Sequence, residues 1–223
     1  MDEALRTELA GFLPFWKHLN DADRAYLEAN TMCVAFGKGA LLHSGEADCI
    51  GVLLIRSGSL CTSLLSEEGR EIMLFRLGAG EVCILAASCV IEQITFDVQI
   101  TTESPTELIV INAHAYKLLC ERNVYVESFT FKSAVDRFSD VMWTMQQILF
   151  KGFDRRLASY LYDETVRLSG DTVRETHEDI ARHTGSAREV VSRMLTRFAD
   201  DGIVSLSRGA IKITDRAKLK ALL

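Results

Sequence analysis

Four polar residues near the C-terminus are spaced so that they can hydrogen-bond to a single surface. They are Arg188, Glu189, Ser192 and Arg193. On a helix that turns by about 100° per residue, all four lie within roughly 140° of one another. Arginine can donate to both acceptors of a guanine in the major groove, and glutamate can accept from the amino group of a cytosine. The quartet therefore predicts a helix face that contacts bases, with Arg193 on guanine and Glu189 on the paired cytosine.

The same stretch carries an apolar face opposite this quartet. On the helical wheel the apolar residues occupy roughly the remaining side, from about 200° to 340°. They are Ala187, Val190, Val191, Met194, Leu195 and Phe198. One face of the predicted helix therefore packs against the protein, and the other is exposed.

Two further elements are expected to hold this helix in place. Thr176 and Asp179 fit a capping box, so a preceding helix is predicted to begin at Thr176 and to end at Gly185. After the helix, apolar residues alternate with polar ones around a turn at Arg208 and Gly209, which predicts a hairpin with Arg208 near DNA phosphate. The alternating residues are Val204, Leu206, Ile211 and Ile213. Together these elements are typical of a winged helix-turn-helix.

Two alternatives to base contact are open at this point. Ser186 and Glu189 also match an S-x-x-E capping box, which would hold the glutamate at the helix terminus. Arg188 and Arg193 would form an ordinary solvated face if the winged helix bound protein, since this fold also serves as an interaction module. The combination of turn, polar quartet and hairpin favours double-stranded DNA as the partner.

Length and composition are consistent with a two-domain globular protein. The chain has 223 residues, of which 48% are hydrophobic. No run approaches the roughly 18 apolar residues of a membrane span, and the N-terminus carries two acidic residues where a signal peptide requires a basic start. We therefore expect a cytoplasmic protein with no membrane partner.

Charge is divided unevenly along the chain. Residues 151–223 hold 14 Lys and Arg against 11 Asp and Glu, whereas residues 1–150 hold 11 against 20. The C-terminal part thus has a net charge of +3, and the remainder has −9. This split indicates an acidic sensing or assembly domain attached to a domain that faces DNA.

The segment from Thr31 to Ile111 consists of short apolar runs separated by glycine. Gly58, Gly69 and Gly80 recur every eleven residues. This spacing predicts an antiparallel β-roll or jelly roll of about eight strands. Residues 2–29 are predicted to form one or two short helices interrupted at Pro14.

A long segment without glycine or proline follows, after a short helix predicted at 114–120. Residues 123–151 are predicted to form one continuous helix, and Gly152 marks a boundary and a hinge. Alternating spacings of three and four residues predict a dimerisation seam, with a second stripe one position away. The seam contains Phe131, Ala134, Phe138, Val141, Met145 and Ile148, and the second stripe contains Val135, Met142 and Leu149. The alternative is a helix buried within its own domain.

These patterns predict an α+β fold in three parts. Residues 1–122 form a β-roll effector domain, 123–152 a dimerisation helix, and 153–223 a winged helix-turn-helix. Two such winged helices in a twofold dimer would reach half-sites about one DNA turn apart.

The order of elements, with G-S-A-R-E-V-V-S-R at 185–193, resembles the superfamily of the cyclic AMP receptor protein and the fumarate-nitrate reduction regulator, known as Crp/Fnr. RSGSL at 56–60 and LGAGEV at 77–82 are similar to its cyclic-nucleotide-binding-like barrel. The resemblance implies a homodimeric transcriptional regulator that binds palindromes with a TGA core and contacts RNA polymerase. It also implies base contacts by the quartet and phosphate contacts by Thr176, His177 and Ser186.

The residues that would bind cyclic AMP in this superfamily are replaced here. Ile84 and Leu85 stand where a glycine-glutamate pair is expected, and Phe96 and Asp97 stand near the expected arginine-serine pair. A phosphate anion requires positive charge or converging N–H donors, and an aspartate repels it. Polar positions that meet the purine correspond to Val141 and Met142. We therefore do not expect cyclic AMP to be the effector.

No other cofactor is expected. Oxygen-sensing relatives carry an N-terminal cysteine cluster for an iron–sulfur centre, but the first cysteine of this chain is Cys33. Haem would require an axial ligand in the barrel, and no histidine follows Cys83 closely. A cupin-like metalloenzyme would place two histidines one residue apart, whereas His18, His43 and His114 are scattered. We therefore expect neither a metal site nor an enzyme.

The nature of any effector is left open. One hypothesis is an apolar pocket for an unknown small molecule, although the same side chains would equally form ordinary core. Its residues would be Cys83, Ile84, Leu85, Cys89, Phe96, Val141 and Met142. The alternative is a thiol- or metal-responsive regulator that uses Cys83 and Cys89, although neither has a cationic neighbour in sequence that would activate a thiol.

Overall fold

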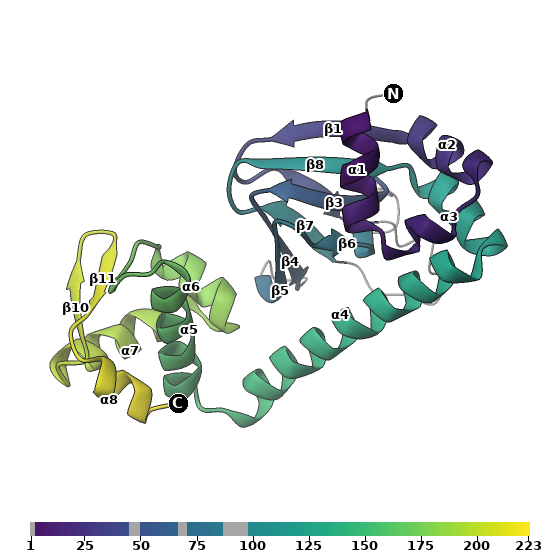
Figure 1. The fold of residues 1–223 in the computed structure, drawn as a ribbon. Helices are drawn as coiled ribbons and strands as arrows, with labels where there is room; N and C mark the ends of the chain where they lie inside the picture. The colour runs from purple at the N-terminus through teal and green to yellow at the C-terminus, as the bar shows by residue number, and fades with distance from the viewer. Residues whose placement is uncertain (1–2, 45–49, 67–70, 87–97) are drawn as a thin grey trace. The chain divides into compact units, whose positions relative to one another are not determined.

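The computed structural model describes residues 3–44, 50–66, 71–86 and 98–223, and the chain divides into two units (Figure 1). The first comprises Met1–Leu64 and Leu74–Val141, and the second comprises Leu65–Met73 and Met142–Leu223. Within the described residues, no helix combines the length and apolar character needed to cross a membrane.

Three short helices begin the first unit. They are α1 (Glu3–Phe12), the 3-10 helix η1 (Pro14–His18) and α2 (Asp21–Ala29). Pro14 opens η1, where its missing N–H breaks no helical hydrogen bond. The side chain of Asn20 caps α2 by accepting from the backbone N–H of Asp23 at 2.8 Å. The predicted interruption at Pro14 is confirmed.

Two four-stranded antiparallel sheets follow, with strand orders β1-β8-β3-β6 and β2-β7-β4-β5. The strands are β1 (Thr31–Phe36), β2 (Leu41–Ser44), β3 (Val52–Ser57), β4 (Ser59–Leu65), β5 (Glu71–Gly78), β6 (Val82–Cys83), β7 (Gln99–Thr102) and β8 (Thr106–Ile111). Gly58 joins β3 to β4 with φ of 85°, and a Cβ there would lie 2.4 Å from Oγ1 of Thr106, so only glycine fits. These eight strands confirm the β-roll.

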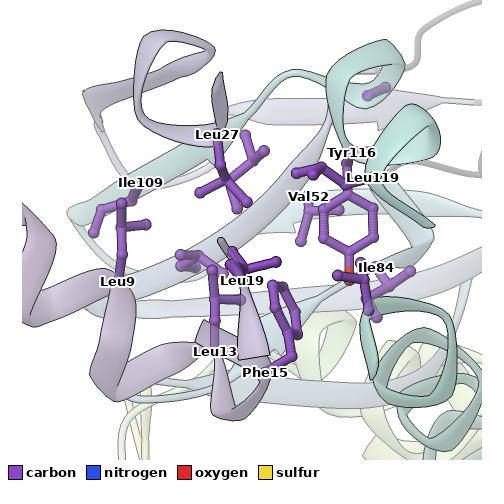
Figure 2. Packing of buried hydrophobic residues seen from close by; sticks show 14 residues of the cluster. Leu9, Leu13, Phe15, Leu19, Leu27, Val52, Ile84, Ile109, Tyr116 and Leu119 are labelled. Carbon is purple, nitrogen blue, oxygen red and sulfur yellow. The ribbon is translucent and has the colours of Figure 1, made fainter. Parts of the chain in front are cut away.

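Alternate residues of the central strands enter two separate cores. Val52 and Leu54 of β3 belong to a cluster with the N-terminal helices, Tyr116 and Leu119, which Figure 2 shows from close by. Leu53 and Ile55 belong to the second cluster, with residues of both sheets. Because side chains alternate between the faces of a strand, continuous apolar runs allow β3 and β8 to serve both cores.

Helices α3 (Ala113–Arg122) and α4 (Val124–Phe150) follow the β-roll. The hydroxyls of Tyr116 and Thr130 are hydrogen-bonded at 2.9 Å, which ties α3 to the first turns of α4. Helix α4 has 27 residues and is drawn as one continuous helix in Figure 1, so the predicted long helix is confirmed.

The second unit holds the remaining elements. They are α5 (Phe153–Arg167), β9 (Thr172–Val173), α6 (His177–Thr184), α7 (Arg188–Asp200), β10 (Val204–Ser207), β11 (Ala210–Ile213) and α8 (Arg216–Ala221). The three strands form an antiparallel sheet of order β10-β11-β9. Apolar residues of every one of these elements meet in one core, which holds α7 against the sheet and against α5.

Candidate nucleic-acid interface

Helix α6 begins and ends where the sequence predicts. The N–H of Asp179 donates to Oγ1 of Thr176 at 3.1 Å, and the carboxylate of Asp179 accepts from the N–H of Thr176 at 3.2 Å. This is the predicted capping box. At the other end, Gly185 has φ of 60° and ends the helix in the left-handed conformation that favours glycine.

The turn from Gly185 leads into α7, whose apolar side is buried. Val191, Leu195 and Phe198 lie in the core of the unit. On the other side Arg188, Glu189 and Arg193 are exposed, and Ser192 is half-buried. The four predicted base-contact residues therefore share the solvent side of one helix, and we call this surface the base-contact face.

The capping-box alternative at Ser186 and Glu189 is wrong. The N-cap residue of α7 is Ala187, and no side chain caps the helix there. Within the part of the chain that the structure describes, the side chains of Arg188, Glu189 and Arg193 form no hydrogen bond or ion pair. These three side chains are exposed donors and acceptors, as a surface that hydrogen-bonds to bases requires.

The predicted hairpin is present beside α7. In it β10 pairs with β11, with Val204 opposite Ile213 and Leu206 opposite Ile211. Val204, Ile211 and Ile213 are buried, whereas Leu206 is exposed. Arg208 and Gly209 form the two-residue turn, and Arg208 is exposed at the tip.

The other predicted phosphate contacts lie at the ends of α6. Thr176 is exposed at its N-terminus, and His177 is half-buried as its first residue. Ser186 is half-buried in the turn before α7. The free N–H groups and the positive dipole end of a helix favour phosphate at such positions.

A polar network that the sequence did not reveal joins α5 to α6. The hydroxyl of Tyr160 donates to the carboxylate of Glu175 at 2.5 Å and lies 2.5 Å from Nδ1 of His183. The side chain of His183 is buried, with 4% of its surface exposed. These residues come from three separate segments, so their spacing gives no sequence signal.

Comparisons with known proteins agree with this architecture. Residues 155–222 match the family model of the Crp-like helix-turn-helix domain. A crystal structure of a Crp/Fnr family transcriptional regulator from Eubacterium rectale is similar to the whole chain. The identity is 43%, the TM-score is 0.92, and the match covers 95% of this chain and 98% of that one.

The chain belongs to the Crp/Fnr family of DNA-binding transcriptional regulators.

Two other proteins are similar to this chain at lower identity. The cAMP-activated global transcriptional regulator CRP of Haemophilus influenzae is 23% identical over 173 residues, which cover 75% of this chain and 76% of that protein. The c-di-GMP responsive regulator CLP of Xanthomonas campestris has the same fold, with a TM-score of 0.70 and 19% identity. That match covers 88% of this chain and 100% of that one.

In this Crp/Fnr protein, the predicted dimer residues of α4 differ in exposure. Phe131, Phe138 and Met145 are exposed. Ala134 and Val141 instead pack against the two cores of the first unit, and Ile148 is half-buried. The second stripe of Val135, Met142 and Leu149 is exposed along its length.

Among the described residues, those predicted for the effector pocket are divided between the two cores and the surface of the first unit and the start of the second. Cys83 and Leu85 are buried in the core between the sheets, whereas Ile84 is buried in the core beneath the N-terminal helices. Val141 packs half-buried against the former core, and Met142 is exposed. Cys89 and Phe96, like Asp97, lie outside the described residues.

Burial determines the reactivity expected of the Cys83 thiol. Cys83 is a free thiol with 1% of its surface exposed. Burial raises the pKa of Cys83 to about 11, which disfavours the reactive thiolate at neutral pH. The charge of Arg137 lowers this pKa less than burial raises it, and the thiol does not have the exposure that a sensing cysteine requires.

Proposed function

We propose that this regulator acts as a homodimer on a palindromic DNA site, under the control of a signal other than cyclic AMP. Two features support the proposal. The base-contact face is fully available to a ligand, and α4 presents an apolar stripe that a second copy of the helix would cover.

The stripe on α4 follows alternating spacings of four and three residues. Its apolar members, all exposed, are Val124, Phe131, Val135, Phe138, Met142, Met145 and Leu149. We call this set the α4 seam. Side chains such as Phe138, 64% exposed, and Leu149, 65% exposed, favour burial because each square ångström of apolar surface removed from water contributes about 25 cal/mol.

The α4 seam uses exposed Leu149 in place of half-buried Ile148, and Val135 and Met142 in place of Ala134 and Val141 of the sequence-based seam. Those two residues already pack against the cores of their own chain. A heptad repeat in which the first and fourth positions are apolar is typical of a two-helix coiled coil. Parallel pairing of two such helices would give the two winged helices the twofold symmetry of a palindrome.

The roles at the DNA follow from the chemistry of each side chain. We assign Arg193 to a guanine and Glu189 to the paired cytosine, with Arg188 and Ser192 on neighbouring base edges. Thr176, His177, Ser186 and Arg208 are assigned to phosphates. Base contacts give sequence preference, whereas phosphate contacts position the helix.

The chemistry of Ile84 and Leu85 argues against cyclic AMP as the signal. Both side chains are buried and apolar, with 2% and 5% of their surface exposed. They offer no charge or N–H donor to a cyclic phosphate. Titration calorimetry with cyclic AMP and cyclic GMP tests this part of the proposal, and binding at micromolar affinity would contradict it.

A pair of variants tests the assignment at the DNA. Arg193→Ala is expected to cost about 1 to 3 kcal/mol and to relax preference at one base position. Arg208→Ala removes one cation as well, but is expected to weaken all sequences equally and to reduce the salt dependence by about one counterion. Equal sequence preference in wild type and Arg193→Ala would remove Arg193 from the base-contact face.

A further inference from the structure

The junction between α4 and α5 lies within the second unit and has only two linking residues, Lys151 and Gly152. A glycine at such a position predicts a hinge, because it lets the backbone turn freely. In the structure the side chain of Arg156, in the first turn of α5, spans this junction.

The guanidinium of Arg156 donates hydrogen bonds to three backbone carbonyls. Its Nη1 donates to the carbonyl of Lys151 at 2.8 Å and to that of Ile148 at 3.3 Å, at the end of α4. Its Nε donates to the carbonyl of Thr184 at 3.1 Å, at the end of α6. One side chain therefore bridges the ends of two helices on either side of the junction.

Two of these acceptors, the carbonyls of Ile148 and Thr184, lie in the last turns of α4 and α6. The last carbonyls of a helix have no intrahelical donor and carry its partial negative charge, so a cation is favoured there. Burial lowers the pKa of Arg156, and the ring of Phe153 covers it at 5.5 Å from the guanidinium carbon. The planar guanidinium of an arginine presents five N–H donors on three nitrogens in fixed directions, whereas the three donors of a lysine all lie on one nitrogen and rotate freely.

A second contact joins the same two helix ends. A Cβ on Gly185 would lie 3.0 Å from Cδ1 and 3.2 Å from Cγ1 of Ile148, so the turn before α7 rests on the last turns of α4. The same end of α4, from Met142 onward, belongs to the unit that contains α7. The helix-turn-helix that carries the base-contact face is thus attached to the end of α4 in two ways. Arg156 bonds to both Ile148 and Thr184, and Gly185 packs against Ile148.

We propose that Arg156 is a positioning residue for DNA recognition, which holds the end of α4 and the helix-turn-helix as one rigid piece. The inference rests on the proposed dimer. In that dimer, the separation of the two base-contact faces is set by the paired α4 helices and transmitted through Arg156. We call the three hydrogen bonds of Arg156 the clamp. Loss of the clamp makes the backbone at Gly152 flexible, while each base-contact face can still recognise its own half-site.

Binding to palindromes with altered centres tests this role in the full chain. The distance between half-sites is varied by one or two base pairs in either direction, and affinity is measured for each DNA and for an isolated half-site. We expect wild type to discriminate between the best and worst spacings by roughly 100-fold, because a rigid bivalent contact depends on matched geometry. In Arg156→Gln the discrimination falls below about tenfold, with half-site affinity unchanged.

Matched variants distinguish loss of the clamp from loss of a positive charge and from a failure to fold. Arg155→Gln removes the neighbouring exposed arginine and should keep the wild-type spacing profile. Arg156→Lys keeps the charge without the fork and should give an intermediate profile, which serves as the test if Arg156→Gln does not fold. A wild-type profile in the folded Arg156 variant overturns the clamp. A wild-type protein that shows no paired-site binding at all overturns the proposed function instead.

Discussion

At the scale of single residues, the position of Glu189 is compatible with two roles, one in the helix and the other in the proposed contact with a base. It occupies the first turn of α7, where a carboxylate interacts favourably with the positive end of the helix. The N-cap residue is Ala187 and no side chain caps the helix, and the carboxylate of Glu189 is exposed. The residue can therefore stabilise the helix and accept a hydrogen bond from a base.

The capping box of α6 makes the stability of the winged helix depend on pH. Burial alone would raise the pKa of Asp179, but hydrogen bonds from Thr176 and the charge of Arg182 lower it below its ordinary value. A lowered pKa means that the folded state gains stability above the unfolded value of 3.8 and loses it as pH falls through the folded value. We expect Asp179→Asn to lower the free energy of unfolding by about 0.5 to 1 kcal/mol at pH 7.

This difference from wild type should begin to shrink below about pH 4, where the unfolded chain takes up a proton at Asp179, and should vanish only below the lowered pKa of the folded state. Urea unfolding of both proteins between pH 3 and pH 7 measures it. A gap that is equally large at both ends of this range would show that the charge of Asp179 contributes nothing to the cap.

Burial of Cys83 predicts a protected thiol. At pH 8 a thiol reagent should modify exposed Cys33 quickly, and should reach Cys83 only after unfolding, since its pKa of about 11 leaves little thiolate. Mass spectrometry of the modified peptides checks this. Rapid peroxide oxidation of Cys83 accompanied by a change in DNA affinity would instead support a thiol-responsive regulator.

At the scale of elements, local signals determine what the sequence could predict. Thr176, Gly185 and Gly209 act through their own backbone and nearest neighbours, so the boundaries of α6 and the hairpin turn were predictable. The face of α4 was not, because two apolar stripes lie side by side and only tertiary packing decides that Ala134 and Val141 are covered. The hydrogen bond of Arg156 to the carbonyl of Thr184 joins residues 28 positions apart, and a backbone acceptor can belong to any residue type, so the sequence shows no pattern for it.

The α4 seam predicts how the helix assembles. Phe138→Glu places a charge in the middle of the seam and should convert a dimer into a monomer, with palindrome affinity reduced by about 100-fold. Lys132→Glu is the matched control, since it adds a carboxylate to the same helix about 120° away from Phe138. Sedimentation velocity measures the assembly. A monomeric wild type, or a dimeric Phe138→Glu protein, would rule out the seam as the dimer interface.

At the scale of the whole molecule, the two parts of the chain differ in net charge and in the structures that they form. Residues 1–150, which have a net negative charge, contain the two sheets of the β-roll. Residues 151–223, which have a net positive charge, contain the base-contact face. Family membership establishes a DNA-binding regulator. Its assembly on a symmetrical site is the central claim that connects α4 to the winged helix.

Selection of bound DNA from a random pool with the full-length protein tests this claim most directly. We predict enrichment of an inverted repeat whose half-sites are centred about one helical turn, or roughly 10 base pairs, apart, with a G·C pair in each half at the position assigned to Arg193 and Glu189. Enrichment of a single unpaired motif, or of no sequence at all, would contradict the account.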